Sequence, residues 1–455
     1  MTGEQEDLPS VMYDLAEKAL EIAPSEGQNV VKTTQIPHLK REYRVPGDDL
    51  PGNPVFRTTE EEINKDGVGA EVHREVYEEL QSTDVYEDAL SMIEDRDFQT
   101  HTVPSPESAI ISFISSILNN AEEGIDKRDI TRIVSIFTTE IDGSAIYWSP
   151  SVWIVGLSLG EKNNIQLSEE ISLRKPKKED LVEEISLKKD SLPGRRAVGM
   201  PERAPTAILE FNERGENRQD IYEYIQVFIS VLQLFDVGSV SSMKTDFHCK
   251  SVLRPFPIPG NYLNEDTPFE YVLDNSKVEN LPDFYHDMHD VVESNLLDDE
   301  KNNYLSISFD RYENAIKENN APESQLTSAI MALEAMLLKN EEKGELSERL
   351  SRRADILLGM FDHQSIEVSK KIKEAYKIRS RYVHGSETER DYNEDLVYDI
   401  VDYARACLVI QLILSDNYDK KTLLNKIDNS SVQIESRESL EENIDEITPD
   451  WVSQI

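Results

Sequence analysis

The residues best suited to chemistry lie together in the segment EAYKIRSRYVHGSE, residues 374–387. Arg379, Ser380, Arg381 and His384 fall within six residues there, directly before Gly385. An imidazole changes charge near neutral pH and can transfer a proton, while a guanidinium binds and stabilises an oxyanion. These residue types therefore suit proton transfer beside a developing negative charge, with a serine hydroxyl as a third polar group.

The spacing of these residues predicts that they lie at the end of a helix. At about 100° per residue, Ser380 and His384 lie one turn apart on the same face, and Arg379 lies next to that face with a side chain long enough to reach it. Gly385 provides a C-terminal stop, so His384 is expected in the last turn, where the helix dipole favours an imidazolium. A histidine at a helix end is often simply a cap, and this second interpretation stays open.

A cluster of basic residues leads up to this segment. Residues 349–381 contain nine Lys and Arg side chains against four Asp and Glu, within a chain whose formal net charge is −41. The nine are Arg349, Arg352, Arg353, Lys370, Lys371, Lys373, Lys377, Arg379 and Arg381. Clustered positive charge is the electrostatic footprint of a phosphate-binding surface, although basic residues paired with acidic neighbours on solvated helices would produce the same sequence.

Composition excludes several function classes. The 89 acidic residues against 48 basic ones indicate a solvated acidic surface, as in proteins adapted to high salt, and mimicry of a nucleic acid is the less favoured interpretation. With Cys249 and Cys407 as the only cysteines, a disulfide framework or a cysteine-based zinc site is excluded. No apolar run reaches the roughly 20 residues of a membrane span and no secretory signal opens the sequence, so a cytoplasmic location is expected. The absence of a Walker-type Gly-rich loop argues against an ATPase.

The first 275 residues are expected to form two mixed regions. Residues 1–100 are acidic, and helices are predicted at residues 11–22 and 60–93 on either side of a turn-rich loop. Residues 101–275 are expected to form an α+β domain of unknown role that begins with a helix at Ser105 and Pro106. Aromatic, β-branched and alternating residues predict strands at 144–159, 164–175, 206–211 and 241–253. A short helix is predicted within residues 173–185, and an amphipathic helix at residues 221–235.

From residue 280 onward the sequence predicts helices only. Residues 280–428 are expected to form an all-α, up-and-down bundle, because the loops between the helices are short. Residues 394–414 are apolar nearly all round, as a central bundle helix would be. Residues 429–455 carry seven acidic residues and one Arg and are expected to form an exposed acidic tail. The predicted fold class is α+β, with a mixed α/β N-terminal region followed by the helical bundle.

Residues 283–415 resemble a HEPN domain of the Apea-like branch. Three segments carry the resemblance in order: SISFDRYENAI, SAIMALEAMLLKNEEKGELSERLSRRADILLG and IKEAYKIRSRYVHG. The HEPN hallmark is an Arg and a His separated by four to six residues, commonly with a polar residue directly after the Arg. Arg379, Ser380 and His384 fit this pattern, with four residues between the Arg and the His.

The resemblance implies a metal-independent endoribonuclease in which two subunits pair through the bundle, so that two copies of the motif line one cleft. His384 would take a proton from the ribose 2′-hydroxyl or donate one to the leaving oxygen. Arg379 would hold the scissile phosphate, and Ser380 would orient the phosphate or His384. Attack by the 2′-hydroxyl makes RNA the implied substrate and a cyclic 2′,3′-phosphate the implied product. Many HEPN relatives are toxins or antiviral defence effectors.

Several binding partners follow as expectations. Lys373, Lys377 and Arg381 are the candidate RNA-binding residues, and neither a metal nor another cofactor is expected. The expected partners are RNA, a second copy of the chain, and a regulatory partner for the N-terminal region, with no membrane. The alternative is a non-catalytic HEPN module that dimerises or binds RNA or another partner.

Two other local patterns offer different chemistry. His286 and His289 stand one helical turn apart with an aspartate after each, which could hold a metal ion but lacks a spaced third ligand. A solvated helix face is the favoured interpretation of that pattern. His248 beside Cys249 could form a thiol nucleophile, but neighbouring residues of a strand point to opposite faces of the sheet.

Overall fold

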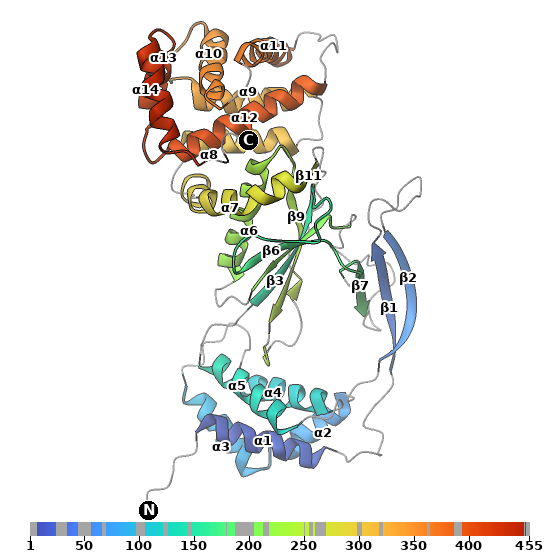
Figure 1. Cartoon of the computed structure of the whole chain (residues 1–455). Helices are drawn as coiled ribbons and strands as arrows, with labels where there is room; N and C mark the ends of the chain where they lie inside the picture. The colour runs from blue at the N-terminus through green and yellow to red at the C-terminus, as the bar shows by residue number, and fades with distance from the viewer. Residues whose placement is uncertain are drawn as a thin grey trace, which may run out of the picture.

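The computed structural model describes residues 7–23, 34–43, 56–65, 70–96, 105–121, 126–142, 148–178, 180–186, 204–212, 218–249, 251–253, 258–259, 270–297, 303–317, 322–361, 365–385, 394–449 and 451. Helices and antiparallel strands both occur among them, so the α+β class is confirmed. Figure 1 shows a helical layer first, then the strands, then a second group of helices at the C-terminal end. Within the described ranges, no helix has the length and apolarity needed to cross a membrane.

The first helical layer consists of five helices that share one core. They are α1 (Leu8–Ile22), α2 (Ala70–Leu80), α3 (Asp84–Glu94), α4 (Pro106–Ala121) and α5 (Lys127–Ile141). Phe113 of α4 and Phe137 of α5 are fully buried and meet with ring centroids 4.9 Å apart. Because α4 and α5 pack with α1 to α3, the expected domain boundary at residue 100 falls inside this layer.

Strand pairing overrides two helix predictions. The predicted helix at residues 60–93 is wrong at its start, because β2 (Phe56–Lys65) pairs antiparallel with β1 (Thr34–Tyr43), and only α2 and α3 follow as helices. The short helix predicted within residues 173–185 is also wrong, because β7 (Val182–Ser186) pairs with the other edge of β1. Pairing with a strand that lies far away in the sequence can outweigh the local propensity of such segments.

The larger sheet has six antiparallel strands in the order β10-β9-β3-β8-β6-β5. They are β3 (Trp148–Val155), β5 (Asn164–Gln166), β6 (Ile171–Arg174), β8 (Ala207–Phe211), β9 (Ser241–Cys249) and β10 (Ile258–Pro259). A short parallel pair, β4 (Leu157–Ser158) and β11 (Tyr271–Val272), lies beside it. The predicted strands are confirmed within their described residues, with two differences. Residues 164–175 form the hairpin β5–β6 rather than one strand, and the strand predicted at 144–159 is divided at Gly156 into β3 and β4, which pair in different sheets.

One hydrophobic core runs from this sheet into the C-terminal helices. Val152 and Ile154 of β3 face this core, whereas Trp153 and Val155 between and after them face a small cluster on the opposite side, as the alternation of a strand requires. The helices are α6 (Arg218–Phe235), α7 (Asn275–Leu296), α8 (Tyr304–Lys317), α9 (Pro322–Leu337), α10 (Leu346–Gly359), α11 (Ser365–Val383), α12 (Glu394–Leu414), α13 (Lys420–Ser430) and α14 (Ile434–Asp445).

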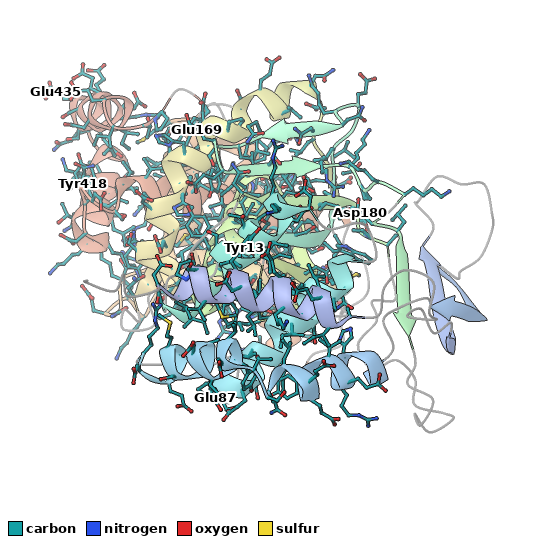
Figure 2. The ribbon with its side chains drawn as sticks, turned by 90° about the horizontal axis from the view of Figure 1, so that it is seen from below. Tyr13, Glu87, Glu169, Asp180, Tyr418 and Glu435 are labelled. Atoms are coloured by element: carbon teal, nitrogen blue, oxygen red, sulfur yellow. The ribbon has the colours of Figure 1, made fainter. Side chains whose placement is uncertain are left out.

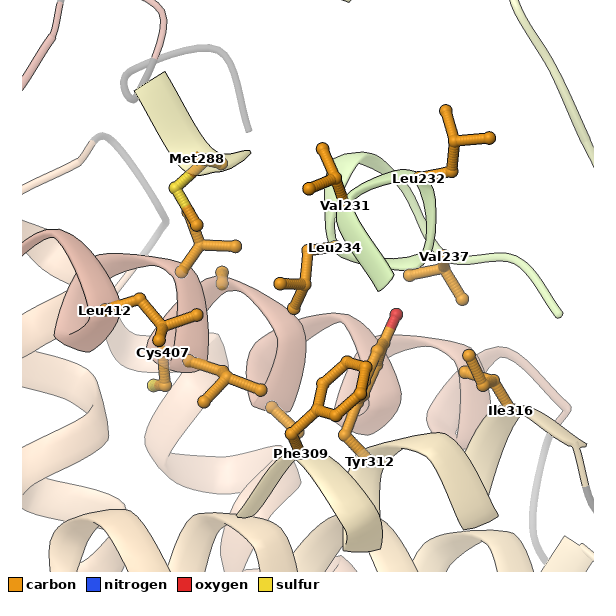
Figure 3. Packing of buried hydrophobic residues seen from close by; sticks show 14 of the residues in the cluster. Val231, Leu232, Leu234, Val237, Met288, Phe309, Tyr312, Ile316, Cys407 and Leu412 are labelled. Atoms are coloured by element: carbon orange, nitrogen blue, oxygen red, sulfur yellow. The ribbon is translucent and has the colours of Figure 1, made fainter. Parts of the chain in front are cut away.

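Helix α12 is the central helix of this group, as its apolar sequence predicts. It contacts α7, α8, α9, α10 and α11, and Cys407 in its middle is fully buried (Figure 3). Burial raises the pKa of the Cys407 thiol far above its ordinary value, which suits a small core residue rather than a nucleophile.

The end of the chain differs from the exposed tail that its charge predicts. Helix α14 buries Leu440 and Ile444, which lie four residues apart and face the core. Trp451 is also buried, packs on Phe284 of α7 and donates a hydrogen bond to Asp287 at 2.8 Å. Glu435, Glu438 and Glu442 of α14 are exposed, and Glu435 lies on the outer surface (Figure 2).

The last turn of α6 is satisfied by side chains from other elements. The final four carbonyl groups of a helix lack partners within the helix. Here the carbonyl oxygen of Leu232 accepts from the Tyr271 hydroxyl at 3.0 Å and that of Gln233 from the Tyr312 hydroxyl at 2.7 Å. The Tyr312 hydroxyl points toward α6 in Figure 3. Arg405 of α12 completes the set, as its Nη1 donates to the carbonyl oxygens of residues 234 and 235 at 3.0 and 3.2 Å.

Candidate site at the C-terminal end of α11

Helix α11 presents one apolar face to the other helices and one polar face to solvent. Val368, Ile372 and Ala375 are buried and recur at helical spacing against α9, α10 and α12. Arg379 continues this inward row, because it lies four residues after Ala375. The predicted arginine of the motif therefore begins on the packed side of the helix rather than on its solvent side.

Arg379 is held by two neighbours on that packed side. Its Nη2 lies 3.1 Å from Oε2 of Glu334 on α9, and its guanidinium lies over the ring of Tyr376, with Cζ 5.6 Å from the ring centroid. About a quarter of the side chain (24%) is exposed. The Nε of Arg379 is buried and has no hydrogen-bond partner among the described residues, so one donor of the fork is unused. Burial first, and then the nearby Glu334 carboxylate, raise the pKa of the Tyr376 phenol.

Ser380 and His384 lie together on the other side of the helix end. The His384 N–H donates to the Ser380 carbonyl oxygen at 3.2 Å, one turn apart as predicted. The His384 side chain is exposed, and its imidazole makes no hydrogen bond to any described residue. At about 100° per residue, His384 is about 140° around the axis from Arg379. Ser380 and His384 are thus linked through the backbone one turn apart, while the Arg379 guanidinium is bound to Glu334 on the packed side of the helix.

The helix stop predicted at Gly385 is confirmed. Helix α11 ends at Val383, and Gly385 has φ +65°, in the left-handed region that favours glycine. Its N–H donates to the Tyr382 carbonyl oxygen at 3.1 Å. His384 therefore stands one residue beyond the helix, on a turn that exposes Tyr382 and Val383 (43% and 57%) as well.

The basic cluster mostly serves to hold the helices together. Six of its nine members form ion pairs: Arg349, Arg352, Arg353, Lys371, Lys373 and Arg379. Arg353 is fully buried and donates to Glu342 and to Asp428 at 2.6 to 2.8 Å. Although burial alone raises the pKa of Asp428, hydrogen bonds from Arg353 and Lys339 outweigh it and lower that pKa to about 2. Paired acidic neighbours, the less specific interpretation, explain most of this cluster.

Three basic side chains of α11 remain on its solvent side. Lys370, Lys377 and Arg381 are exposed, and no carboxylate of the described residues lies within ion-pair distance of them. Of the expected RNA-binding residues, Lys377 and Arg381 are therefore accessible, while Lys373 is paired with Glu348 of α10 at 2.8 Å. Lys370 belongs with the accessible pair, and its spacing of seven residues before Lys377 was the sequence signal for it.

On α7, the potential metal ligands that lie close together are not the pair of histidines that the sequence suggests. His289, Asp290 and Glu293 of α7 place one ligand atom each within 4.8 Å of one another, so Glu293 at i+4 is the third donor that spacing could have identified. His286 is exposed and is not a member of this group. His289 packs between the rings of Tyr224 and Tyr285, at 4.8 and 5.4 Å, whereas the Asp290 side chain is 96% exposed. Asp290 and Glu293 are exposed, as a solvated helix face requires, whereas His289 packs against aromatic rings, so the predicted solvated face includes the two carboxylates but not this imidazole. The side chains of His248 and Cys249 lie outside the described residues.

A cavity of about 150 Å³ lies where α6, α7, α12 and Trp451 meet. Its charged groups are already paired, with Lys277 bound to Asp236 and Arg405 bound to Asp402. Sequence reasoning missed this cavity because its walls come from four separate segments spread over residues 235–451.

The chain was compared with protein families, curated proteins and solved structures. No family model, no curated protein and no solved structure matches the chain.

Proposed function

We propose that α7 to α13 form a HEPN-type domain and that the chain is a metal-independent endoribonuclease, of the kind that acts as a toxin or antiviral defence effector. One observation carries the proposal: the hallmark residue His384 stands exposed at the end of α11, one turn after the half-buried Ser380 and beside accessible Lys377 and Arg381. A buried histidine cap would have left no imidazole for a substrate. The exposed Tyr382 and Val383 give a second copy of the chain an apolar surface beside the motif.

The proposed reaction is an internal displacement at phosphorus. The ribose 2′-oxygen forms a bond to the phosphorus, the bond from phosphorus to the 5′-oxygen breaks, and a cyclic 2′,3′-phosphate results. One imidazole accepts the proton of the 2′-hydroxyl and another donates a proton to the leaving 5′-oxygen, so two copies of His384 across a dimer cleft supply both groups. The guanidinium of Arg379 binds the phosphate oxygens as charge develops on them.

A second function is favoured by the position of Arg379. Because its guanidinium is bound to Glu334 and directed away from His384, a bundle that binds RNA or a protein partner without cutting it fits the same geometry. The two functions differ in whether a phosphodiester bond is ever broken.

The test is cleavage of single-stranded RNA in excess EDTA, measured at low and at high salt. The first function predicts cleavage that ends in a cyclic phosphate. It also predicts that His384→Ala and Arg379→Ala each reduce the rate by about 10²- to 10⁴-fold, because a proton-transfer group or a phosphate ligand is lost. His286→Ala is the matched control, since His286 is an exposed histidine on α7 outside the motif, and it should leave the rate unchanged.

Circular dichroism of each variant establishes that the fold is intact. Cleavage that survives both motif substitutions, or that requires a divalent ion, contradicts the ribonuclease function. RNA binding without cleavage at any protein concentration supports the second function.

A further inference from the structure

The contacts of Arg379 describe an arginine that is already bound to a carboxylate. Glu334 and Arg379 come from different helices, α9 and α11, and both side chains are only partly exposed, at 20% and 24%. A single Nη2–Oε2 contact of 3.1 Å joins them, so the pair is not the bidentate fork that this guanidinium could form. Within the described part of the chain, the buried Arg379 Nε has no hydrogen-bond partner.

This incomplete pairing matters because a phosphate competes for the same donors. A guanidinium binds a phosphate in a bidentate manner, which uses the orphan Nε together with an Nη. Glu334 uses only one donor of the guanidinium, so a phosphate bound in a bidentate manner would form more hydrogen bonds to Arg379 than this carboxylate does. The Glu334 carboxylate would also repel a phosphate that approached Arg379 while the pair was closed.

The position of the pair adds a geometric reason. Arg379 faces α9 and the ring of Tyr376, about 140° around the helix from His384. For both side chains to contact one phosphate, the guanidinium must leave Glu334 and swing toward the exposed end of α11. The tether to Glu334 therefore sets how readily Arg379 becomes available.

We infer that Glu334 is a positioning residue that withholds Arg379 from RNA, and that an RNA phosphate binds Arg379 only by displacing the Glu334 carboxylate. This inference rests on the proposed role of Arg379 in binding the phosphate. It makes Glu334 a determinant of substrate affinity without any contact of its own with the reacting atoms.

The experiment measures the affinity of the full chain for a fluorescent, uniformly 2′-O-methylated RNA, which lacks the nucleophile and cannot be cut. Glu334→Gln keeps the shape of the side chain and removes its charge. It should bind this RNA about three- to tenfold more tightly than the wild type and raise the slope of log affinity against log salt by about 0.7, for one more phosphate contact. Glu334→Asp, which keeps the charge, should resemble the wild type.

Two further variants establish that the gain acts through Arg379. In an Arg379→Gln background, Glu334→Gln should produce no gain. Asp399→Asn is the matched control, because the Asp399–Lys371 pair also joins α11 to a neighbouring helix, at 2.7 Å and with similar exposure. Asp399→Asn should cause no change in RNA affinity that depends on the presence of Arg379. Melting temperatures show whether each variant is folded.

Unchanged or weaker binding by Glu334→Gln, or a gain that persists without Arg379, overturns the inference. Cleavage of unmodified RNA is followed in parallel so that the two proposals can fail separately. If the wild type cuts RNA but the Arg379-dependent gain is absent, only the role of Glu334 is refuted. If the gain is present but nothing is cut, the ribonuclease function fails and Glu334 controls phosphate binding in an RNA-binding module.

Discussion

The three residues of the motif at the end of α11, Arg379, Ser380 and His384, have different surroundings. Arg379 has Glu334 and Tyr376 as neighbours, Ser380 lies in the last helical turn, and His384 stands on the turn that ends at Gly385. The glycine lets the chain leave the helix in the left-handed region, which a side chain with a Cβ adopts at a cost of about 1 kcal/mol. The exposed position of His384 depends on this turn.

At the residue scale, Gly385→Ala should therefore weaken the turn and reduce RNA cleavage. Apart from its chain neighbours, no atom of the described residues lies within 4 Å of a Cβ placed at Gly385, so backbone strain accounts for the expected loss of about 1 kcal/mol. Thermal unfolding and the cleavage rate are the measurements. Gly344→Ala is the control, since its Cβ also meets open space and its backbone lies outside the left-handed region. Equal losses of stability and cleavage rate in the two variants would show that the left-handed turn at Gly385 is not the cause.

At the scale of the element, α11 divides its charges between two tasks. Lys371, Lys373 and Arg379 bind carboxylates of α12, α10 and α9, whereas Lys370, Lys377 and Arg381 extend into solvent. Lys377 and Arg381 are one turn apart, about 6 Å along the axis, which is near the spacing of successive phosphates in a single strand. The solvent side of α11 is therefore the expected path of an RNA strand toward His384.

If RNA follows this path, the basic residues of α11 should differ in how much each contributes to the salt dependence of RNA binding. Lys377→Gln, Arg381→Gln and Lys370→Gln should each lower the salt dependence of RNA binding by about 0.7 in slope, because one phosphate contact is lost. Lys373→Gln should lower it less, since Lys373 is already paired with Glu348. The slope from fluorescence anisotropy at several salt concentrations decides this. A uniform loss across all four variants would mean that RNA does not follow this side of the helix.

At the scale of the whole molecule, the α+β region and the C-terminal helices are joined through the end of α6. Tyr271, Tyr312 and Arg405 donate to the last four carbonyl groups of that helix, and one hydrophobic core continues across the junction. Arg405 is buried and is also bound to Asp402 at 2.7 Å.

Arg405→Leu should consequently destabilise the protein by about 3–5 kcal/mol, because two carbonyl groups and Asp402 lose their partner inside the fold. Chemical denaturation followed by tryptophan fluorescence measures this, since Trp451 lines the cavity at the same junction. Arg437→Leu is the control, because the Arg437–Glu441 pair lies on the exposed side of α14 and should contribute at most about 0.5 kcal/mol. A small effect at both positions would show that the junction is not held by Arg405.

The sequence by itself determined the elements whose signals are local. Periodicity identified α1, α6, the central helix α12 and most strands, and Gly385 identified the end of α11. Helical geometry also placed Ser380 and His384 on one face, because residues four apart in a helix are always neighbours.

The tertiary structure alone decided which groups meet across elements. Residues 56–65 and 182–186 became strands because both pair with β1, and the acidic C-terminal segment folded back because Leu440, Ile444 and Trp451 found a core to enter. It also bound Arg379 to Glu334, 45 residues away in the chain. The physical reason is the same in each case: a contact between distant segments depends on how the whole chain packs, and no local pattern of residues encodes the partner.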